Sequence, residues 1–227
     1  MKSRTFLASF ASVAALVLGV PQSTIAARRD VSGVRTILAI GNSLTDGYGL
    51  SRSQAYPALL AEKLRKAGYK YAVINAGVSG DTTAGGLRRI LKYSPRKIDI
   101  LIVELGINDA FRSVPVEQMR SNLQGIIDRV RERNPDVEII IAGMQLPLQG
   151  ADSYMRNFGE IFAALAEKNR AALVPYLLEG VGGDPSLNLP DRIHPNAAGQ
   201  RVLAQNVWRV LEPIVQKATA APSARVE

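Results

Sequence analysis

Apolar positions follow two alternating patterns along this chain: short continuous runs, and longer stretches with a helical repeat. Continuous runs of Val, Ile and Leu are typical of strands that are buried on both faces. The runs occupy residues 36–40, 71–75, 98–105, 137–142 and 173–176. The amphipathic stretches predict helices, and these occupy residues 56–67, 83–92, 116–133, 153–169 and 196–217.

Strands that alternate with helices indicate an α/β fold in which helices cover both faces of a parallel sheet. We therefore predict a five-stranded parallel sheet inside a three-layer α/β/α sandwich. A length of 227 residues suits one such domain with a substantial core. In open sheets of this kind the ligand crevice lies outside the carboxyl ends of the strands, so a site is expected in the segments that follow them.

Residues 1–27 have the layout of a cleaved secretory signal peptide. Lys2 and Arg4 form a basic start, residues 6–20 are apolar, and small residues follow at 24–27. The apolar stretch is shorter than the roughly 20 residues that span a bilayer, although an uncleaved anchor is the alternative. We expect a periplasmic or secreted protein without stable membrane insertion. Its domain is expected at residues 28–217, with a flexible tail at 218–227.

The chain contains one histidine and no cysteine. Disulfides, thiolate nucleophiles and cysteine-based metal sites are therefore excluded, and one histidine is too few for an ordinary zinc site. We expect neither metal nor cofactor. The net charge is +8, but basic residues are scattered among acidic ones and do not cluster with aromatic residues. This pattern argues against a nucleic-acid partner.

Residues suited to acyl transfer occur at the ends of the predicted strands and before the last helix. The reaction needs a nucleophile, a base, an acid that orients the base, and donors for the oxyanion. Ser43, His194 and Asp191 can supply the first three. Asn108 offers a side-chain NH₂, Gly77 an unobstructed backbone N–H, and Ser43 its own N–H at a helix start.

Each of these residues also has an ordinary structural interpretation. His194 could pack against or cap a turn, Ser43 could cap a helix, and Gly77 could permit a tight turn. Asn108 and Asp109 could cap a helix together. Their joint occurrence at successive strand ends, with the only histidine at the last of these segments, favours a catalytic site.

Ser79 is a rival nucleophile. It lies in Gly77-Val78-Ser79-Gly80. This stretch does not satisfy the Gly-x-Ser-x-Gly elbow, because Gly80 follows the serine directly.

Four blocks of the chain together resemble the SGNH hydrolase (GDSL esterase/lipase) superfamily, whose name lists its Ser, Gly, Asn and His. The blocks are residues 40–49 (IGNSLTDGYG), 75–82 (NAGVSGDT), 104–109 (ELGIND) and 191–196 (DRIHPN). Within the superfamily the chain is similar to the bacterial branch of arylesterases, acyl-CoA thioesterase I and lysophospholipase L1. The likeness extends over roughly residues 35–215.

The resemblance implies a flavodoxin-like fold and a metal-free serine esterase. It implies that Ser43 is the nucleophile and that Asp191 and His194 are its acid–base pair. The oxyanion donors that it implies are the Ser43 N–H, Gly77 and Asn108. The first block departs from the family, because Asn42 stands where Asp is usual. This change removes a negative charge beside Ser43.

The expected substrates are short to medium acyl esters or thioesters, such as aryl esters, lysophospholipids or acyl-CoA. Apolar residues after the fourth strand are expected to bind the acyl chain, namely Met144, Leu146, Pro147 and Leu148. Two alternatives are a carbohydrate O-acetylesterase and a non-catalytic ligand-binding relative. Intact Ser43, Asp191 and His194 argue against the second.

Overall fold

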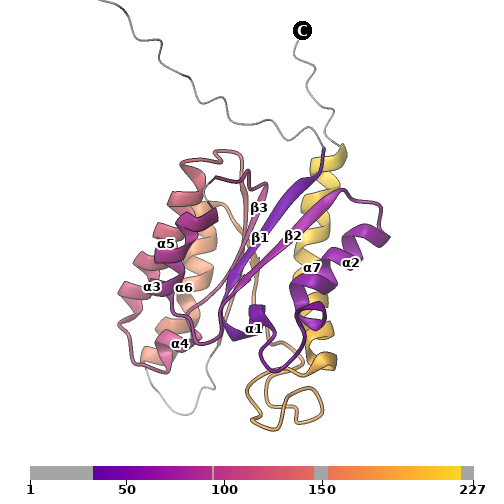
Figure 1. Cartoon of the computed structure of the whole chain (residues 1–227). Coiled ribbons are helices and arrows are strands. Elements are labelled where there is room, and N and C mark those ends of the chain that lie inside the picture. Colours follow the sequence, from indigo (N-terminus) through magenta and orange to yellow (C-terminus); the bar gives the residue numbers. More distant parts are fainter. Residues whose placement is uncertain (1–32, 94, 146–152, 221–227) are drawn as a thin grey trace, which may run out of the picture. The chain divides into compact units, whose positions relative to one another are not determined.

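A computed structural model describes residues 33–93, 95–145 and 153–220 (Figure 1). The chain divides into two units, Met1–Val31 and Ser32–Glu227, and every described residue belongs to the second. The expected signal peptide therefore lies outside the described residues. Within the described ranges no helix has the length and apolarity that crossing a membrane requires.

Five parallel strands form the central sheet, as the sequence predicts. In chain order they are β1 (Arg35–Gly41), β2 (Tyr71–Gly77), β3 (Ile100–Glu104), β4 (Glu138–Ala142) and β5 (Ala172–Val174). Their order across the sheet is β2-β1-β3-β4-β5, and every neighbouring pair is parallel. All five residues of β3 are buried, which explains the apolar run from Ile100 to Val103.

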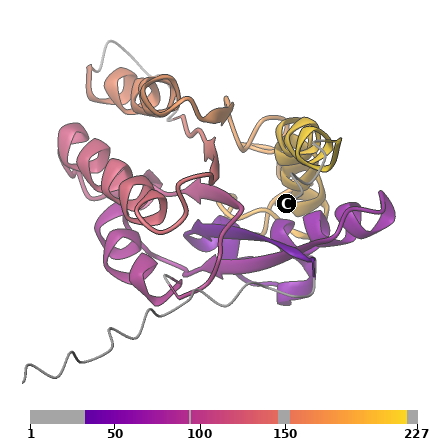
Figure 2. The same cartoon turned by 90° about the horizontal axis from the view of Figure 1, so that it is seen from above.

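Helices cover both faces of the sheet and confirm the three-layer prediction. One face carries α3 (Thr83–Arg89), α5 (Val116–Arg131) and α6 (Ser153–Asn169). The other carries α2 (Tyr56–Lys66) and α7 (Ala197–Ala220), and the view from above separates the same two groups (Figure 2). Five apolar residues of α5 recur at helical spacing and are buried: Met119, Leu123, Ile126, Ile127 and Val130.

The structure differs from the predicted elements at several places. Two short helices were not predicted, α1 (Ser43–Asp46) and α4 (Ile107–Ala110). Four residues make about one helical turn, which is too short to produce a periodic signal. The helix predicted at 83–92 divides into α3 and the 3₁₀ helix η2 (Ile90–Tyr93), and a further 3₁₀ helix is η1 (Arg52–Gln54).

The first three residues of the predicted tail, 218–220, are helical. Helix α7 continues through Ala220, because the helical pattern of its buried face extends to Val215 and one further turn follows. The rest of the predicted tail, residues 221–227, lies outside the described part of the chain.

The strand order places a crevice at the ends of β1 and β3. These strands are neighbours in the sheet. The chain leaves β1 toward α2 on one face and leaves β3 toward α4 and α5 on the other (Figure 1). Such a point of divergence is where open α/β sheets bind their ligands.

Candidate active site

Ser43 begins α1 directly after β1 and is mostly buried, with 8% of its surface exposed. Asn42 caps this helix, because its side-chain oxygen accepts a hydrogen bond of 2.9 Å from the Leu44 N–H. The turn also needs Gly41, since a Cβ there would lie 1.9 Å from Thr45 Oγ1. The Ser43 N–H has no acceptor among the described residues. It is therefore available to a ligand at the helix start.

Ser43, His194 and Asp191 form a continuous line of hydrogen bonds. Ser43 Oγ is 3.0 Å from His194 Nε2, and His194 Nδ1 is 2.8 Å from Asp191 Oδ2. A neutral imidazole that carries its proton on Nδ1 donates to the carboxylate and accepts from the serine hydroxyl. This is the arrangement that activates a serine nucleophile.

The loop that carries the acid and the base is held by its own hydrogen bonds. Asp191 Oδ1 accepts from the backbone N–H groups of Ile193 at 2.9 Å and His194 at 3.0 Å. These bonds, the His194 N–H first, lower the pKa of Asp191 to about 2, so the carboxylate stays ionised. The ring of Tyr48 lies 4.4 Å from the His194 ring between centroids and packs against it at a tilt.

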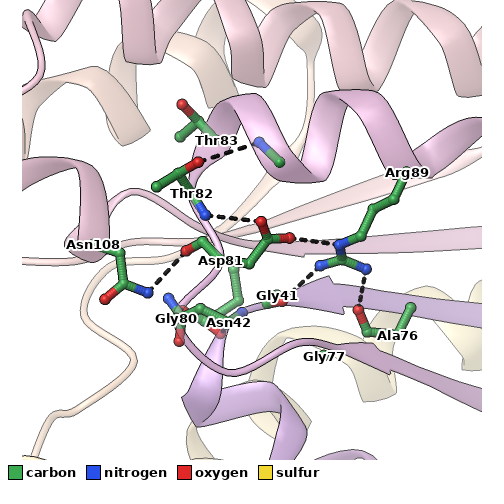
Figure 3. Close-up of polar contacts among 12 residues, drawn as sticks. Gly41, Asn42, Ala76, Gly77, Gly80, Asp81, Thr82, Thr83, Arg89 and Asn108 are labelled. Atoms are coloured by element: carbon green, nitrogen blue, oxygen red, sulfur yellow. Dashed lines mark hydrogen bonds and ion pairs between the residues drawn. The ribbon is translucent and has the colours of Figure 1, made fainter.

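Asn108 is not the helix cap that the alternative interpretation required. The N-cap of α4 is Gly106, and no side chain caps this helix. Asn108 Nδ2 instead donates to the Asp81 carbonyl over 2.8 Å, which leaves its second N–H for a ligand (Figure 3). The carboxylate of Asp109 accepts from the Thr83 N–H and hydroxyl, so it binds the start of α3.

Gly77 does not fit the donor role predicted for it. Its N–H already donates to the side-chain oxygen of Asn75 over 2.9 Å. A Cβ at Gly77 would lie 2.2 Å from the Asp46 backbone nitrogen. Close packing between β2 and α1 therefore explains this glycine, and not the tight turn of its ordinary structural interpretation.

Gly80 is the glycine that sequence reasoning missed. No described residue accepts from its N–H, and its φ of 79° lies in the left-handed region that favours glycine. The next residue, Asp81, holds the Asn108 amide through its carbonyl, which places Gly80 beside Asn108 (Figure 3). The sequence feature that could have indicated this glycine is the Ser-Gly-Asp stretch at residues 79–81.

A cavity of about 750 Å³ opens beside the serine and the histidine. Its wall includes Ser43, Asn108 and His194. The remaining wall is largely apolar, with Leu44, Ile107, Phe111, Tyr176, Leu178 and Ile193, and it also includes Gln145, Gly182, Gly183, Asn188 and Arg192. Apolar side chains thus surround the polar groups that converge on one point, as is usual for small-molecule sites.

The acyl-binding residues predicted after β4 are not confirmed. Met144 is 1% exposed, packs in the core and does not line the cavity. Leu146, Pro147 and Leu148 lie outside the described residues. The cavity instead uses Ile107 and Ile193, which directly precede Asn108 and His194 in the chain.

The rival nucleophile Ser79 has no imidazole beside it. Its hydroxyl donates to Asp46 Oδ2 over 2.7 Å, whereas the only histidine contacts Ser43. In the described ranges no three His, Cys, Asp or Glu side chains gather in a metal-binding group.

Comparison with known proteins identifies the family. The model of the GDSL-like Lipase/Acylhydrolase family matches residues 39–202, which include Ser43, Asn108, Asp191 and His194. The chain belongs to this family.

Two relatives carry the names of an esterase and a thioesterase. The chain is 37% identical to Esterase TesA of Pseudomonas aeruginosa, over 81% of this chain and 91% of that protein. It is 34% identical to thioesterase 1/protease 1/lysophospholipase L1 of Escherichia coli strain K12, over 79% of this chain and 85% of that protein.

A solved structure agrees with the fold. AlinE4, described as an SGNH-hydrolase family esterase, superposes with a TM-score of 0.65 at 41% identity. The match covers 83% of this chain and 98% of that protein. The similarity therefore extends over nearly all of the described domain.

Proposed function

We propose that this GDSL-family protein is a serine hydrolase of acyl esters or thioesters that works through an acyl-enzyme on Ser43. The observation that carries the proposal is the line of hydrogen bonds from Ser43 through His194 to Asp191 at the wall of an apolar cavity. No other described serine has an imidazole within hydrogen-bond distance.

The acylation step follows from the distances. Ser43 Oγ attacks the substrate carbonyl carbon while His194 Nε2 takes the hydroxyl proton over 3.0 Å. Asp191 stabilises the imidazolium that forms, and its ionised carboxylate fixes the ring tautomer. His194 then gives the proton to the leaving alcohol or thiol. Water, deprotonated by the same nitrogen, hydrolyses the acyl-enzyme and returns Ser43.

The tetrahedral intermediate carries a negative oxygen that needs donors. We assign this role to the Ser43 N–H, the free N–H of the Asn108 amide and the Gly80 N–H. Each is a donor with no acceptor among the described residues, and Gly80 replaces Gly77 in the role first expected for the latter. Such preorganised donors are worth the most where charge develops during the reaction.

The apolar cavity supports substrates with an acyl chain. Its volume of about 750 Å³ and its wall of Ile107, Phe111, Tyr176, Leu178 and Ile193 suit a short to medium chain. Aryl esters, lysophospholipids and acyl-CoA are the candidate substrates, in line with the names of the relatives. The basic, apolar and small-residue segments of residues 1–27 support export to the periplasm or medium.

A panel of substrates tests the proposal. Hydrolysis of p-nitrophenyl acetate, butyrate, octanoate and dodecanoate is measured beside acyl-CoA, a lysophospholipid and acetylated sugars. We expect kcat/KM to rise from acetate to a medium chain length. Activity on acetylated sugars alone would favour the O-acetylesterase, and a folded protein inactive on every substrate would favour the non-catalytic relative.

A further inference from the structure

Arg89 is a mostly buried cation that the proposed reaction does not use. It is the last residue of α3, and 12% of its side chain is exposed. Nε donates to Asp81 Oδ2 over 2.5 Å, and Nη2 donates to the Gly41 carbonyl over 2.7 Å. Nη1 donates to the Ala76 carbonyl (Figure 3). One guanidinium thus binds three separate segments of the chain.

Two of these acceptors are at the strand ends that carry the candidate site. Gly41 is the last residue of β1 and comes two residues before Ser43. Ala76 is the last residue but one of β2, whose final residue, Gly77, pairs with Gly41. The guanidinium therefore fixes the start of the nucleophile turn relative to the loop that follows β2.

The third acceptor, Asp81, links Arg89 to the proposed oxyanion donors. Asp81 binds Arg89 through its carboxylate, while its backbone carbonyl accepts from Asn108 Nδ2 over 2.8 Å. Gly80 directly precedes it. Gly85 leaves room for the carboxylate, since a Cβ there would lie 1.7 Å from Asp81 Oδ1.

We propose that Arg89 is a positioning residue for the oxyanion donors. It holds the Gly80–Asp81 turn in position relative to Ser43, and through the Asp81 carbonyl it also holds the Asn108 amide. This inference rests on the proposed serine-hydrolase function. Arg89 touches no reacting atom and acts only through Asp81, Gly41 and Ala76. A planar guanidinium can donate to acceptors in three directions at once. A lysine ammonium is a compact group on a shorter side chain and cannot reach the same three acceptors together.

The test compares four variants with p-nitrophenyl butyrate as substrate. Arg89→Lys keeps the positive charge but loses the planar set of N–H donors. Asp81→Asn removes the carboxylate that Arg89 binds and keeps the Arg89 bonds to the Gly41 and Ala76 carbonyls. Arg88→Met is the matched control, because Arg88 is the neighbouring exposed arginine of the same helix. Asn108→Ala supplies the background for double variants. Turnover is expressed per folded enzyme, from circular dichroism and the melting temperature.

We expect Arg89→Lys to lower kcat on the order of 10²-fold at nearly constant KM, because a small misplacement of donors acts on the transition state. The affinity for an alkyl boronic acid, whose tetrahedral anionic adduct needs the same donors, should fall in proportion to kcat/KM. Arg88→Met should match the wild type. In the Asn108→Ala background, Arg89→Lys should cost less than in the wild type, because the Asn108 donor is already gone and only the Gly80 donor is still displaced.

Two results would overturn the inference. One is a loss in the Arg89→Lys/Asn108→Ala variant equal to the product of the single losses. The other is unchanged kcat per folded Arg89→Lys enzyme. If Arg89→Lys does not fold, the same two measurements are made on Asp81→Asn, alone and combined with Asn108→Ala, and the same two results would overturn the inference. Failure of the proposed function would appear separately, as wild-type protein without esterase activity.

Discussion

Asn42 donates both its backbone N–H and its side-chain NH₂ to the buried carboxylate of Glu104, over 3.0 and 2.7 Å. The Thr45 hydroxyl adds a third donor over 2.7 Å, and no cation faces the carboxylate among the described residues. Burial raises the pKa of Glu104 to about 7, because desolvation outweighs these three donors. The unusual Asn42 thus gives Glu104 a donor where Asp would have placed a second carboxylate.

The pKa of Glu104 predicts a fall in stability as pH rises. The ordinary value near 4.5 applies to the unfolded chain, and the folded value is about 7. The contribution of Glu104 to the free energy of unfolding is therefore complete below pH 4.5 and is lost as pH rises through 7. The total is about 3 kcal/mol. Urea unfolding at pH 5, 6, 7 and 8 measures it.

Glu104→Gln separates this contribution from all other titrating groups. The variant keeps one acceptor and carries no charge, so its stability should vary less between pH 5 and 8 than that of the wild type. Equal slopes for the two proteins would show that Glu104 does not titrate in this range.

Asn42→Asp should make the pH dependence steeper. Two buried carboxylates then face each other, and together they hold a proton to higher pH than Glu104 alone. The melting temperature of the variant, compared with the wild type, should fall more at pH 9 than at pH 5. The double variant Asn42→Asp/Glu104→Gln should return the profile toward that of the wild type, since one buried carboxylate again faces one amide donor.

Ser43→Ala should abolish ester hydrolysis with little change in melting temperature. Members of a catalytic triad act as a unit, and the expected loss is on the order of 10⁴-fold or more. Ser79→Ala is the control and should keep most of the activity, because its hydroxyl contacts Asp46 and not His194. Labelling of Ser79 in place of Ser43 by a fluorophosphonate probe would contradict the assignment.

Asn108→Ala should lower kcat by roughly 10²–10³-fold with little change in KM, because the donor matters chiefly in the transition state. Asn108→Asp should be at least as damaging, since it places a negative charge against the oxyanion. A purely structural role, through the bond to the Asp81 carbonyl, would instead lower the melting temperature and leave the kcat of the folded enzyme unchanged. Wild-type turnover in Asn108→Asp would therefore rule out the donor role.

Chelators and thiol reagents should leave the activity unchanged. The chain has no cysteine, and its single histidine is committed to Ser43 and Asp191. Activity on p-nitrophenyl butyrate is measured after dialysis against EDTA and again after addition of divalent metal. Loss and recovery across these two steps would contradict the metal-free mechanism.

The sequence predicted the sheet and the long helices because their apolar spacing repeats over many residues. It also predicted Ser43, Asp191 and His194 as partners, since each follows or precedes a recognisable element. It could not distinguish Gly77 from Gly80, because the difference lies in whether a side chain, that of Asn75, already accepts the backbone N–H.

The prediction that Met144 lines the acyl pocket is wrong for a similar reason. An apolar residue after a strand can enter either the core or a cavity, and Met144 enters the core. Ile107 and Ile193 were within the recognised blocks, but only the packed structure places them on the cavity wall.

Asp191 and His194 are three residues apart in one loop, and the Asp191 carboxylate binds the backbone of residues 193 and 194 as well as the imidazole. The acid and the base are therefore aligned by hydrogen bonds within one loop. One hydrogen bond joins this loop to the nucleophile 151 residues earlier in the chain, from His194 Nε2 to Ser43 Oγ. A displacement of the loop as a whole changes that single distance and leaves the alignment of the base with its acid intact. Relatives that exchange this loop as a unit would exchange acid and base together.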